Sequence, residues 1–315
     1  MIRLGFNVIS AMVLIASCGI ARGADIGSSF GDSLRILTSA RQAGSGGIAL
    51  EDPWRQGSLV EATTVIQDLG PRWIGFSVQG GAGPTLRLGA DGLYYSPGQI
   101  TQTTETAAGT YGGRGGNLKA VEWGTRFLAQ FSVLDAAGWR VAALGRATGM
   151  MQQLPDVQEV GVAVEAGAQA QHWFDSGLTL TGWLWIGPLG EGASHGFAGQ
   201  ETIGVGLLKP ITHGLLGGAE GYGVGMEGNW LNEGLLHGSL GATYWIGRAS
   251  DPGGTYYLRA GVRSASQTAQ EVQPRAGIGV LWRTPAGWAV QFDYAFVPIG
   301  ELGNFNYATL SLRLR

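Results

Sequence analysis

Five arginines and one aspartate stand at alternate positions in the C-terminal part of the sequence. They are Arg259, Arg263, Arg275, Arg283, Arg313 and Asp293. Guanidinium groups bind carboxylates and phosphates through paired hydrogen bonds, so this set could attract anions or dock a partner. It could also consist of ion pairs internal to the fold, with Asp293 as the acid, and we favour this interpretation.

Four segments would position these groups, namely 255–265, 274–284, 287–297 and 304–314. Their even positions are mostly apolar and their odd positions are polar or cationic. Successive side chains of a strand point to opposite faces, so each segment has one apolar and one polar face. Long neighbouring strands with short turns, an apolar outer face and an arginine-rich inner face favour a closed barrel in lipid over a soluble sandwich. Arg259 and its companions would then face the lumen.

Further strand candidates precede these four, which gives about 14 strands from residue 71 onward. They are 71–79, 84–89, 92–96, 121–134, 138–149, 159–172, 177–187, 201–209, 215–228 and 234–246. A spanning strand needs about 9–11 residues, and the first three candidates are shorter or broken by glycine, so 12 strands remains an alternative. The predicted fold class is all-β, a transmembrane antiparallel barrel with a small N-terminal lumen or plug segment.

The lengths of the connections predict which end of the barrel faces outward. With both chain ends on the periplasmic side, the long connections 97–120, 150–158, 188–200 and 266–273 all become outer loops. Bacterial barrels have this asymmetry between short periplasmic turns and longer outer loops. The same count makes 80–83 an outer loop and Ala90–Asp91 a periplasmic turn. The connection 247–254 is long for a periplasmic turn.

The N-terminal part divides into two segments. Residues 1–24 have a cationic start, an apolar stretch and small residues near Ala21, which is typical of a signal peptide for export. Cys18 follows a loose lipobox, so a lipidated Cys18 is the alternative. Residues 25–70 show no alternation and are interpreted as a plug-like segment or a loosely ordered terminus, and 71–315 as the barrel.

Composition narrows the class of function. The 315 residues carry a formal net charge of −3 and only 14% charged residues, which gives no reason to expect nucleic acid as a partner. The 56 glycines fit neither long helices nor an ordinary α/β enzyme. The single cysteine leaves no disulfide in the body of the chain.

Trp183 and Trp185 share the inner face of 177–187. Indoles in a lumen could contact an apolar ligand or pack on the N-terminal segment, and we favour packing.

Two motifs resemble sites but lack the necessary context. Gly223-Val-Gly225-Met-Glu-Gly228 fits a dinucleotide fingerprint but lies inside a strand candidate, with no helix after it. His237 and Ser239 share a strand face, as a base and a nucleophile would, but no third member is apparent. The sequence therefore predicts no catalytic residues, no metal site, no cofactor and no enzyme.

The C-terminal end resembles the closing motif of a known family. The residues that carry it are Asp293, Tyr294, Ala295, Pro298, Gly300, Leu302 and Gly303. The stretches 238–263, 161–187 and 40–52 match further family segments. The family is PorV/PorQ, among the barrels similar to the FadL fatty-acid transporter. Two departures are the blurred acidic segment Glu51-Asp52-Pro53 and the end at Leu314-Arg315 instead of an aromatic residue.

The resemblance implies a fourteen-stranded FadL-like barrel in the bacterial outer membrane. Family roles range from type IX secretion to the movement of apolar solutes. We therefore expect a barrel that passes or presents apolar substrate or serves as a membrane component of a secretion system. Its partners would be outer-membrane lipid and either apolar small molecules or secretion-system proteins. The alternatives are a structural or docking barrel closed to solutes and a general diffusion porin.

Overall fold

The computed structural model describes most of the chain after Ser39. The described residues are 39–45, 48, 50, 58–67, 72–96, 99–105, 111–119, 121–153, 158–189, 200–211, 219–231, 236–247, 254–264, 272–298 and 304–314. The predicted signal peptide 1–24, with Cys18, lies outside them. In these ranges no helix is long and apolar enough to cross a membrane.

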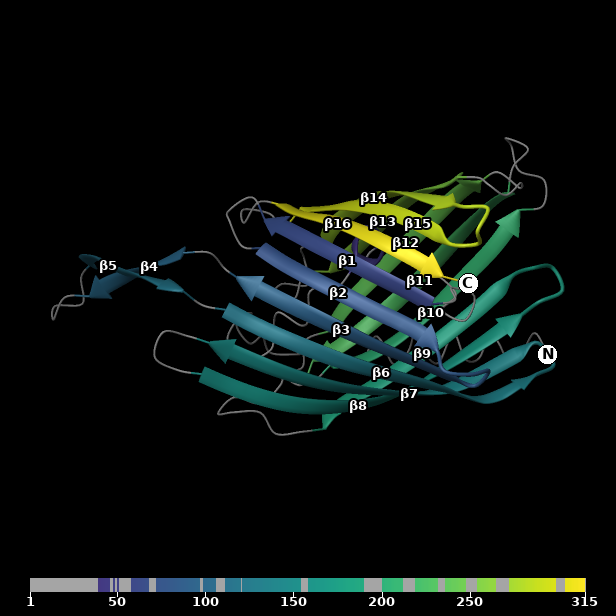
Figure 1. Ribbon diagram of the computed structural model, residues 1–315, viewed down its shortest axis with the longest axis horizontal. Helices are drawn as coiled ribbons and strands as arrows, with labels where there is room; N and C mark the ends of the chain where they lie inside the picture. The colour runs from purple at the N-terminus through teal and green to yellow at the C-terminus, as the bar shows by residue number, and fades with distance from the viewer. Residues whose placement is uncertain are drawn as a thin grey trace.

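Fourteen antiparallel strands close into one barrel, which confirms the predicted fold class (Figure 1). The strands are β1 (Ser58–Gln67), β2 (Arg72–Gly81), β3 (Leu86–Ser96), β6 (Val121–Ala136), β7 (Trp139–Gln153), β8 (Gln158–Trp173), β9 (Thr179–Leu189), β10 (Gln200–Ile211), β11 (Ala219–Leu231), β12 (Leu236–Gly247), β13 (Gly254–Ser264), β14 (Val272–Arg283), β15 (Ala289–Pro298) and β16 (Asn304–Leu314). The barrel closes where β1 pairs with β16, from Ser58 with Leu314 to Gln67 with Phe305.

The two faces of each strand differ as the alternation predicts. Large apolar side chains stand exposed on the outside, with Phe76 at 59%, Phe127 at 60% and Leu258 at 58% exposed. Inward positions bury polar groups, and both Gln291 and Asp293 are fully buried. An apolar exterior around a polar interior is the arrangement of a barrel whose solvent is lipid.

The start of the barrel differs from the prediction. Residues 58–67, which the sequence analysis placed in the plug-like segment 25–70, form β1 and pair with both β2 and β16. The candidates 84–89 and 92–96 are one strand, β3, so the expected periplasmic turn at Ala90–Asp91 is wrong. Asp91 instead points inward and accepts a hydrogen bond from Arg126 Nε at 2.9 Å. The unpredicted strand β1 adds one strand, and the merging of two candidates into β3 removes one. The number of barrel strands therefore stays at the predicted fourteen.

The connections fall at two ends. The turns after β2, β6, β8 and β14 lie at the same end as the last residues of β16, at the right of Figure 1. Residues 82–85 belong to this end, so the expectation of an outer loop at 80–83 is wrong. The strand ends that flank 97–120, 154–157, 190–199 and 265–271 all lie at the other end, hereafter the loop end.

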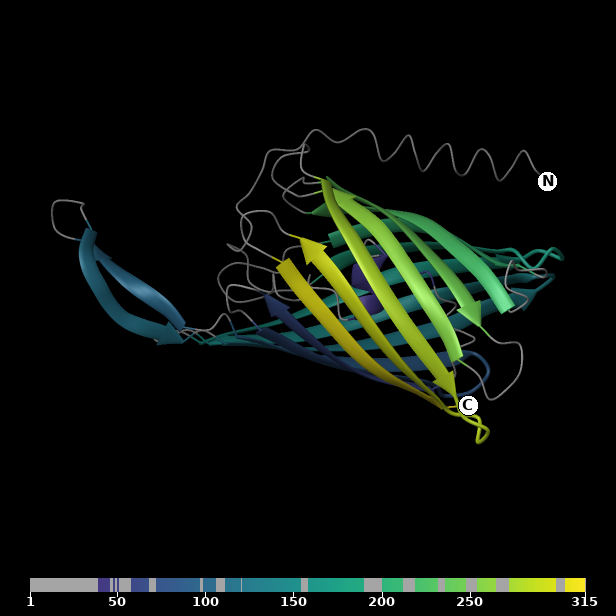
Figure 2. The ribbon, with the colours of Figure 1, turned by 90° about the horizontal axis from the view of Figure 1, so that it is seen from above.

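The longest connection has a structure of its own. Within it, β4 (Gln99–Glu105) and β5 (Tyr111–Lys119) pair as a separate two-stranded sheet. This hairpin projects beyond the loop end of the barrel, at the left of Figures 1 and 2.

Candidate functional site: a lumenal segment tied to the barrel wall

A short part of the N-terminal region lies inside the barrel. Its helix α2 (Ala40–Gly44) is the purple element within the ring of strands in Figure 2, and it contacts β13, β14, β15 and β16. Ser39 caps its N-terminus, since the Ser39 hydroxyl accepts from the backbone N–H of Gln42. We call Ser39–Ser45, together with Ile48 and Leu50, the lumenal segment.

Small residues let α2 lie directly on the wall. Ala40 and Ala43 are fully buried. A Cβ added at Gly44 would stand 2.9 Å from Gly277 Cα on β14, closer than real contacts allow. The two backbones therefore approach here because neither residue has a side chain.

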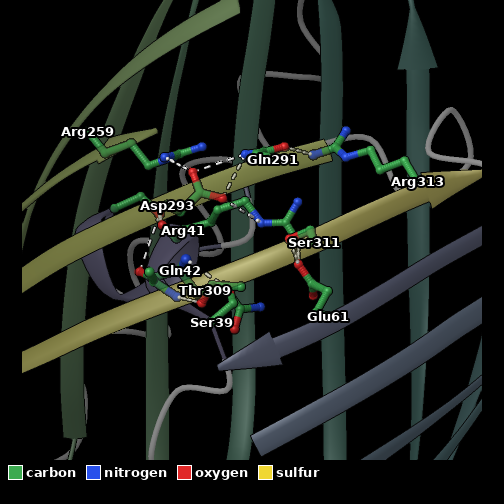
Figure 3. Close-up of polar contacts among 12 residues, drawn as sticks. Ser39, Arg41, Gln42, Glu61, Arg259, Gln291, Asp293, Thr309, Ser311 and Arg313 are labelled. Atoms are coloured by element: carbon green, nitrogen blue, oxygen red, sulfur yellow. Dashed lines mark hydrogen bonds and ion pairs between the residues drawn. The ribbon is translucent and has the colours of Figure 1, made fainter. Parts of the chain in front are cut away.

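Arg41 links this helix to two strands of the wall (Figure 3). Its guanidinium donates to Glu61 on β1 and lies 3.8 Å from Asp293 on β15. The Arg41 side chain is only 10% exposed, and Glu61 and Asp293 are still more buried. Buried charges need partners with good geometry, so these contacts fix the position of α2.

Asp293 is the centre of the network. It accepts from Arg259 Nη1 at 2.7 Å, and Gln291 Nε2 donates to both of its oxygens, at 3.0 and 2.8 Å. Arg313 in turn donates to Gln291. Gly279 leaves the space for the Arg259–Asp293 pair, because a Cβ there would lie 2.1 Å from Asp293 Oδ1.

A second set of contacts crosses the closing seam of the barrel. Ser311 on β16 donates to Glu61 on β1 at 2.8 Å, and the hydroxyls of Thr63 and Thr309 lie 2.8 Å apart. The backbone N–H of Ala40 donates to Thr309 Oγ1 at 2.8 Å. The lumenal segment is thus bound to the first and the last strand together.

The other end of the lumenal segment reaches the adjoining strands of the wall, β12, β11 and β10. Ile48 is 1% and Leu50 is 5% exposed. They lie against glycines that line β10, β11 and β12, namely Gly206, Gly225 and Gly241. A Cβ at Gly225 would stand 2.7 Å from Leu50 Cδ2. The contacts of the segment therefore follow the inner wall from β1 and β16 through the neighbouring strands to β10.

An apolar cluster lies beside α2, toward the loop end. Its buried members are Ala40, Ala43, Val65, Trp73, Leu93, Ala295, Val297 and Tyr307. Trp73 stacks on Tyr95 and contacts Phe305 edge-on, with ring centroids 4.8 and 5.0 Å apart.

The remaining predicted lumen residues lie on the inner face as follows. Arg263 and Arg275 stand on β13 and β14 toward the loop end, and Arg283 donates to Thr255 Oγ1 at 2.9 Å toward the other end. Trp183 packs on Gly204 and donates to Glu227 Oε2 at 3.0 Å. Arg146 lies over the ring of Trp185, 4.6 Å from its centroid. Their roles stay predictions.

The residues of the family motif on β15 point alternately into the barrel and out of it. Tyr294 lies on the outer face and its hydroxyl bonds Asn306 Oδ1 at 2.6 Å, while Ala295 is buried inside and Pro298 ends β15. Gly300, Leu302 and Gly303 lie outside the described residues.

Ser239 is buried on the inner face of β12, whereas the side chain of His237 is outside the described set. No group of three His, Cys, Asp or Glu side chains that could hold a metal occurs in the described ranges.

Sequence reasoning missed Arg41 and Glu61. Arg41 stands alone in a non-alternating stretch, and its two acidic partners are distant in sequence. The only signal for Glu61 was weak: Glu61 and Thr63 stand at alternate positions, separated by Ala62.

Together, the closed sheet, apolar exterior and polar lumen define an outer-membrane-type β-barrel. Solved structures of this class are similar. CdiB from Acinetobacter baumannii matches with a TM-score of 0.50 and 10% identity, over 82% of this chain and 60% of that chain. The chain therefore spans less than two thirds of CdiB.

Two other structures match at lower TM-scores. The COG4313 outer membrane channel from Pseudomonas putida F1 matches at 0.43, with 11% identity over 83% of this chain and 98% of that one. OpdK from Pseudomonas aeruginosa with vanillate matches at 0.39, with 13% identity over 81% and 96%. No protein-family model and no curated protein matches the sequence. The likeness to CdiB agrees with the fold of the barrel, and the PorV/PorQ resemblance stays a prediction.

Proposed function

We propose that this chain is a PorV/PorQ, FadL-like barrel of the bacterial outer membrane that passes or presents an apolar substrate or serves as a membrane component of a secretion system. The observation that carries the proposal is the buried network that ties Arg41 of α2 to Glu61 and Asp293. It supports a lumen divided by the chain's own N-terminal segment.

A general diffusion porin has a water-filled lumen. Here the contacts of the lumenal segment extend from Glu61 on β1 to Gly206 on β10, which are the ends of a run of eight neighbouring strands. An added Cβ at Gly225 would collide with Leu50, and one at Gly277 would lie 3.1 Å from Gly44 Cα. Such a close fit along this run of strands favours a resident element over an open pore.

Apolar surface inside the barrel supports an apolar substrate. Trp73, Leu93 and Tyr307 form a buried cluster beside α2, although most inward positions of a channel for polar solutes are polar. A substrate that passes α2 on the loop side would meet this cluster.

The β4–β5 hairpin favours a second function, the docking of a partner. It pairs with no barrel strand in the described ranges and projects beyond the loop end (Figure 2). An isolated two-stranded hairpin is marginally stable in water, so a partner strand would stabilise it. Replacement of 97–120 by a short turn would distinguish partner docking from substrate passage. It removes the hairpin that would dock the partner and leaves the lumen unchanged.

Ion conductance in planar bilayers tests the proposal. The mature protein, Arg41→Gln and Arg140→Gln are compared, each checked for folding by heat-modifiability on gels. Arg140 pairs with Asp135 at a turn, so it is the matched control. We expect little steady conductance from the unmodified protein and Arg140→Gln, and increased or flickering conductance from Arg41→Gln. A large steady conductance of the unmodified protein would favour a diffusion porin instead.

A further inference from the structure

The outer surface of the barrel carries charge at only one described place. In the fourteen strands, the outward side chains that the structure describes include only two formal charges, Lys209 on β10 and Glu220 on β11. The other described outward residues are apolar, small or uncharged, as on a surface in contact with lipid. A charged side chain that faces lipid is costly unless it reaches the interface or a partner.

Both charges lie at the end of the barrel opposite the loop end, hereafter the turn end. Lys209 stands two residues before the end of β10, and Glu220 is the second residue of β11. Tyr256 and Trp282 stand exposed on the outer face near the same ends of β13 and β14. Outward Tyr and Trp residues mark the level of the lipid headgroups. Lys209 therefore lies at headgroup level rather than within the hydrocarbon.

The two charges differ in what they contact within the protein. Glu220 is buried and accepts a hydrogen bond from the Tyr244 hydroxyl at 2.8 Å. In the part of the chain that the structure describes, no ion pair or hydrogen bond engages the Lys209 ammonium. The hydroxyl of Tyr222 likewise has no hydrogen-bond partner among the described residues. A cation and a hydroxyl donor are thus left for a group outside the protein.

Lys209 and Tyr222 lie side by side on the outer face. They are directly opposite each other in the β10–β11 ladder. Residues in this relation have Cβ atoms about 4.5–5.5 Å apart. Each side chain has a long apolar body and a polar tip, which such side chains extend to the interface. The ammonium offers three N–H donors and the hydroxyl one O–H donor, so together they suit an anion with several oxygens.

We propose that Lys209 and Tyr222 bind the phosphodiester group of a phospholipid in the leaflet at the turn end. The phosphate oxygens accept charge-assisted hydrogen bonds from the ammonium and the hydroxyl, and the phosphate neutralises Lys209. The acyl chains lie along the outer face of β11, where Val224 and Met226 stand exposed on the loop side of Tyr222. The site goes beyond the proposed function, because it lies on the outer surface and does not depend on what occupies the lumen.

The test measures thermal unfolding of the folded mature protein in maltoside micelles, which contain no phosphate, read from the heat-modifiability gel. Dioleoyl phosphatidylglycerol is titrated, and dioleoylglycerol, which has the same acyl chains and no phosphate, is the reference lipid. A ligand that binds only the folded state raises the midpoint. We expect phosphatidylglycerol to raise the midpoint of the unmodified protein above its value in dioleoylglycerol. Lys209→Gln should need about tenfold more phosphatidylglycerol for the same rise, because it loses a hydrogen bond from a charged group.

Three further variants separate lipid binding from a structural role. Arg140→Gln removes a cation that is paired with Asp135 at the same end, so it should respond like the unmodified protein. Lys209→Arg keeps the charge and should keep the response. Tyr222→Phe keeps the ring, removes one donor and should weaken the response, which keeps the test valid if Lys209→Gln does not fold. An undiminished response in Lys209→Gln, or in Tyr222→Phe where Lys209→Gln does not fold, would overturn the site.

Phosphatidylethanolamine distinguishes the phosphodiester from a general attraction to a negatively charged micelle. It contains the same phosphodiester group but has no net charge. We expect it to raise the midpoint of the unmodified protein and to lose this effect in Lys209→Gln. A response confined to phosphatidylglycerol, or no response to either phospholipid, would overturn the proposal.

Discussion

Asp293→Asn is the substitution that should most weaken this barrel. Asp293 is fully buried and pairs with Arg259, whose side chain is 3% exposed. Removal of one partner from a buried ion pair costs about 3–5 kcal/mol, because the other charge stays buried without compensation. Asparagine keeps the size of the side chain, so the loss reports charge and hydrogen bonding rather than a cavity.

The assay is the urea midpoint of unfolding in micelles, followed by heat-modifiability. Asp135→Asn is the matched control, since the Asp135–Arg140 pair is exposed and such pairs contribute about 0–1 kcal/mol. The double variant Arg259→Met with Asp293→Leu should recover much of the loss, because no charge of that pair is then left buried. If Asp293→Asn changes the midpoint no more than Asp135→Asn, the reasoning about this network is refuted.

Three further predictions concern packing, lipid and the hairpin. Gly277→Val should displace α2, because a Cβ there would stand 3.1 Å from Gly44 Cα, and protease cleavage near 40–50 should then increase in the folded barrel; unchanged protection would contradict this. Phe127→Arg, on the outer face near the middle of β6, should cost up to about 2–4 kcal/mol in bilayers, and an unchanged unfolding midpoint would argue against lipid contact. Replacement of 97–120 by a short turn should leave the unfolding midpoint unchanged, because β3 and β6 pair without the hairpin, and a large loss would contradict its independence.

The C-terminal strands could be predicted from the sequence because their two faces differ strongly. In 304–314 the predicted and observed bounds coincide, since Leu310, Leu312 and Leu314 alternate with Thr309, Ser311 and Arg313. Each outward position contacts lipid and each inward position contacts polar groups, so composition follows parity.

The first strand could not be predicted because its faces are similar. Leu59 and Val65 point inward, while Ala62 and Thr64 point outward, so β1 has little amphipathic contrast. The sequence prediction divided β3 at Ala90–Asp91, because glycines at 89 and 92 interrupt the strand on both sides of this pair. Gly92 serves a different purpose, because a Cβ there would lie 2.1 Å from the Phe76 ring on β2.

The lumenal network depends on contacts between residues far apart in the chain. Arg259 and Asp293 share the inner parity, which the alternation predicted. Arg41 contacts a strand 252 residues later in the sequence, and only the closed barrel brings the two together. No local pattern of residues indicates such a pair.

The account depends most directly on the position of α2 against the β15–β16 wall. Cysteines placed at Ala40 and Thr309, in a Cys18→Ser background, should be joined by a short bismaleimide in intact outer membranes, since the Ala40 N–H bonds the Thr309 hydroxyl. The control protein carries Ala40→Cys together with Gln130→Cys, at an inward position on β6. We expect the cysteines at 40 and 309 to be cross-linked and the cysteines at 40 and 130 to remain unlinked. A folded barrel in which the first pair does not cross-link would contradict the central claim.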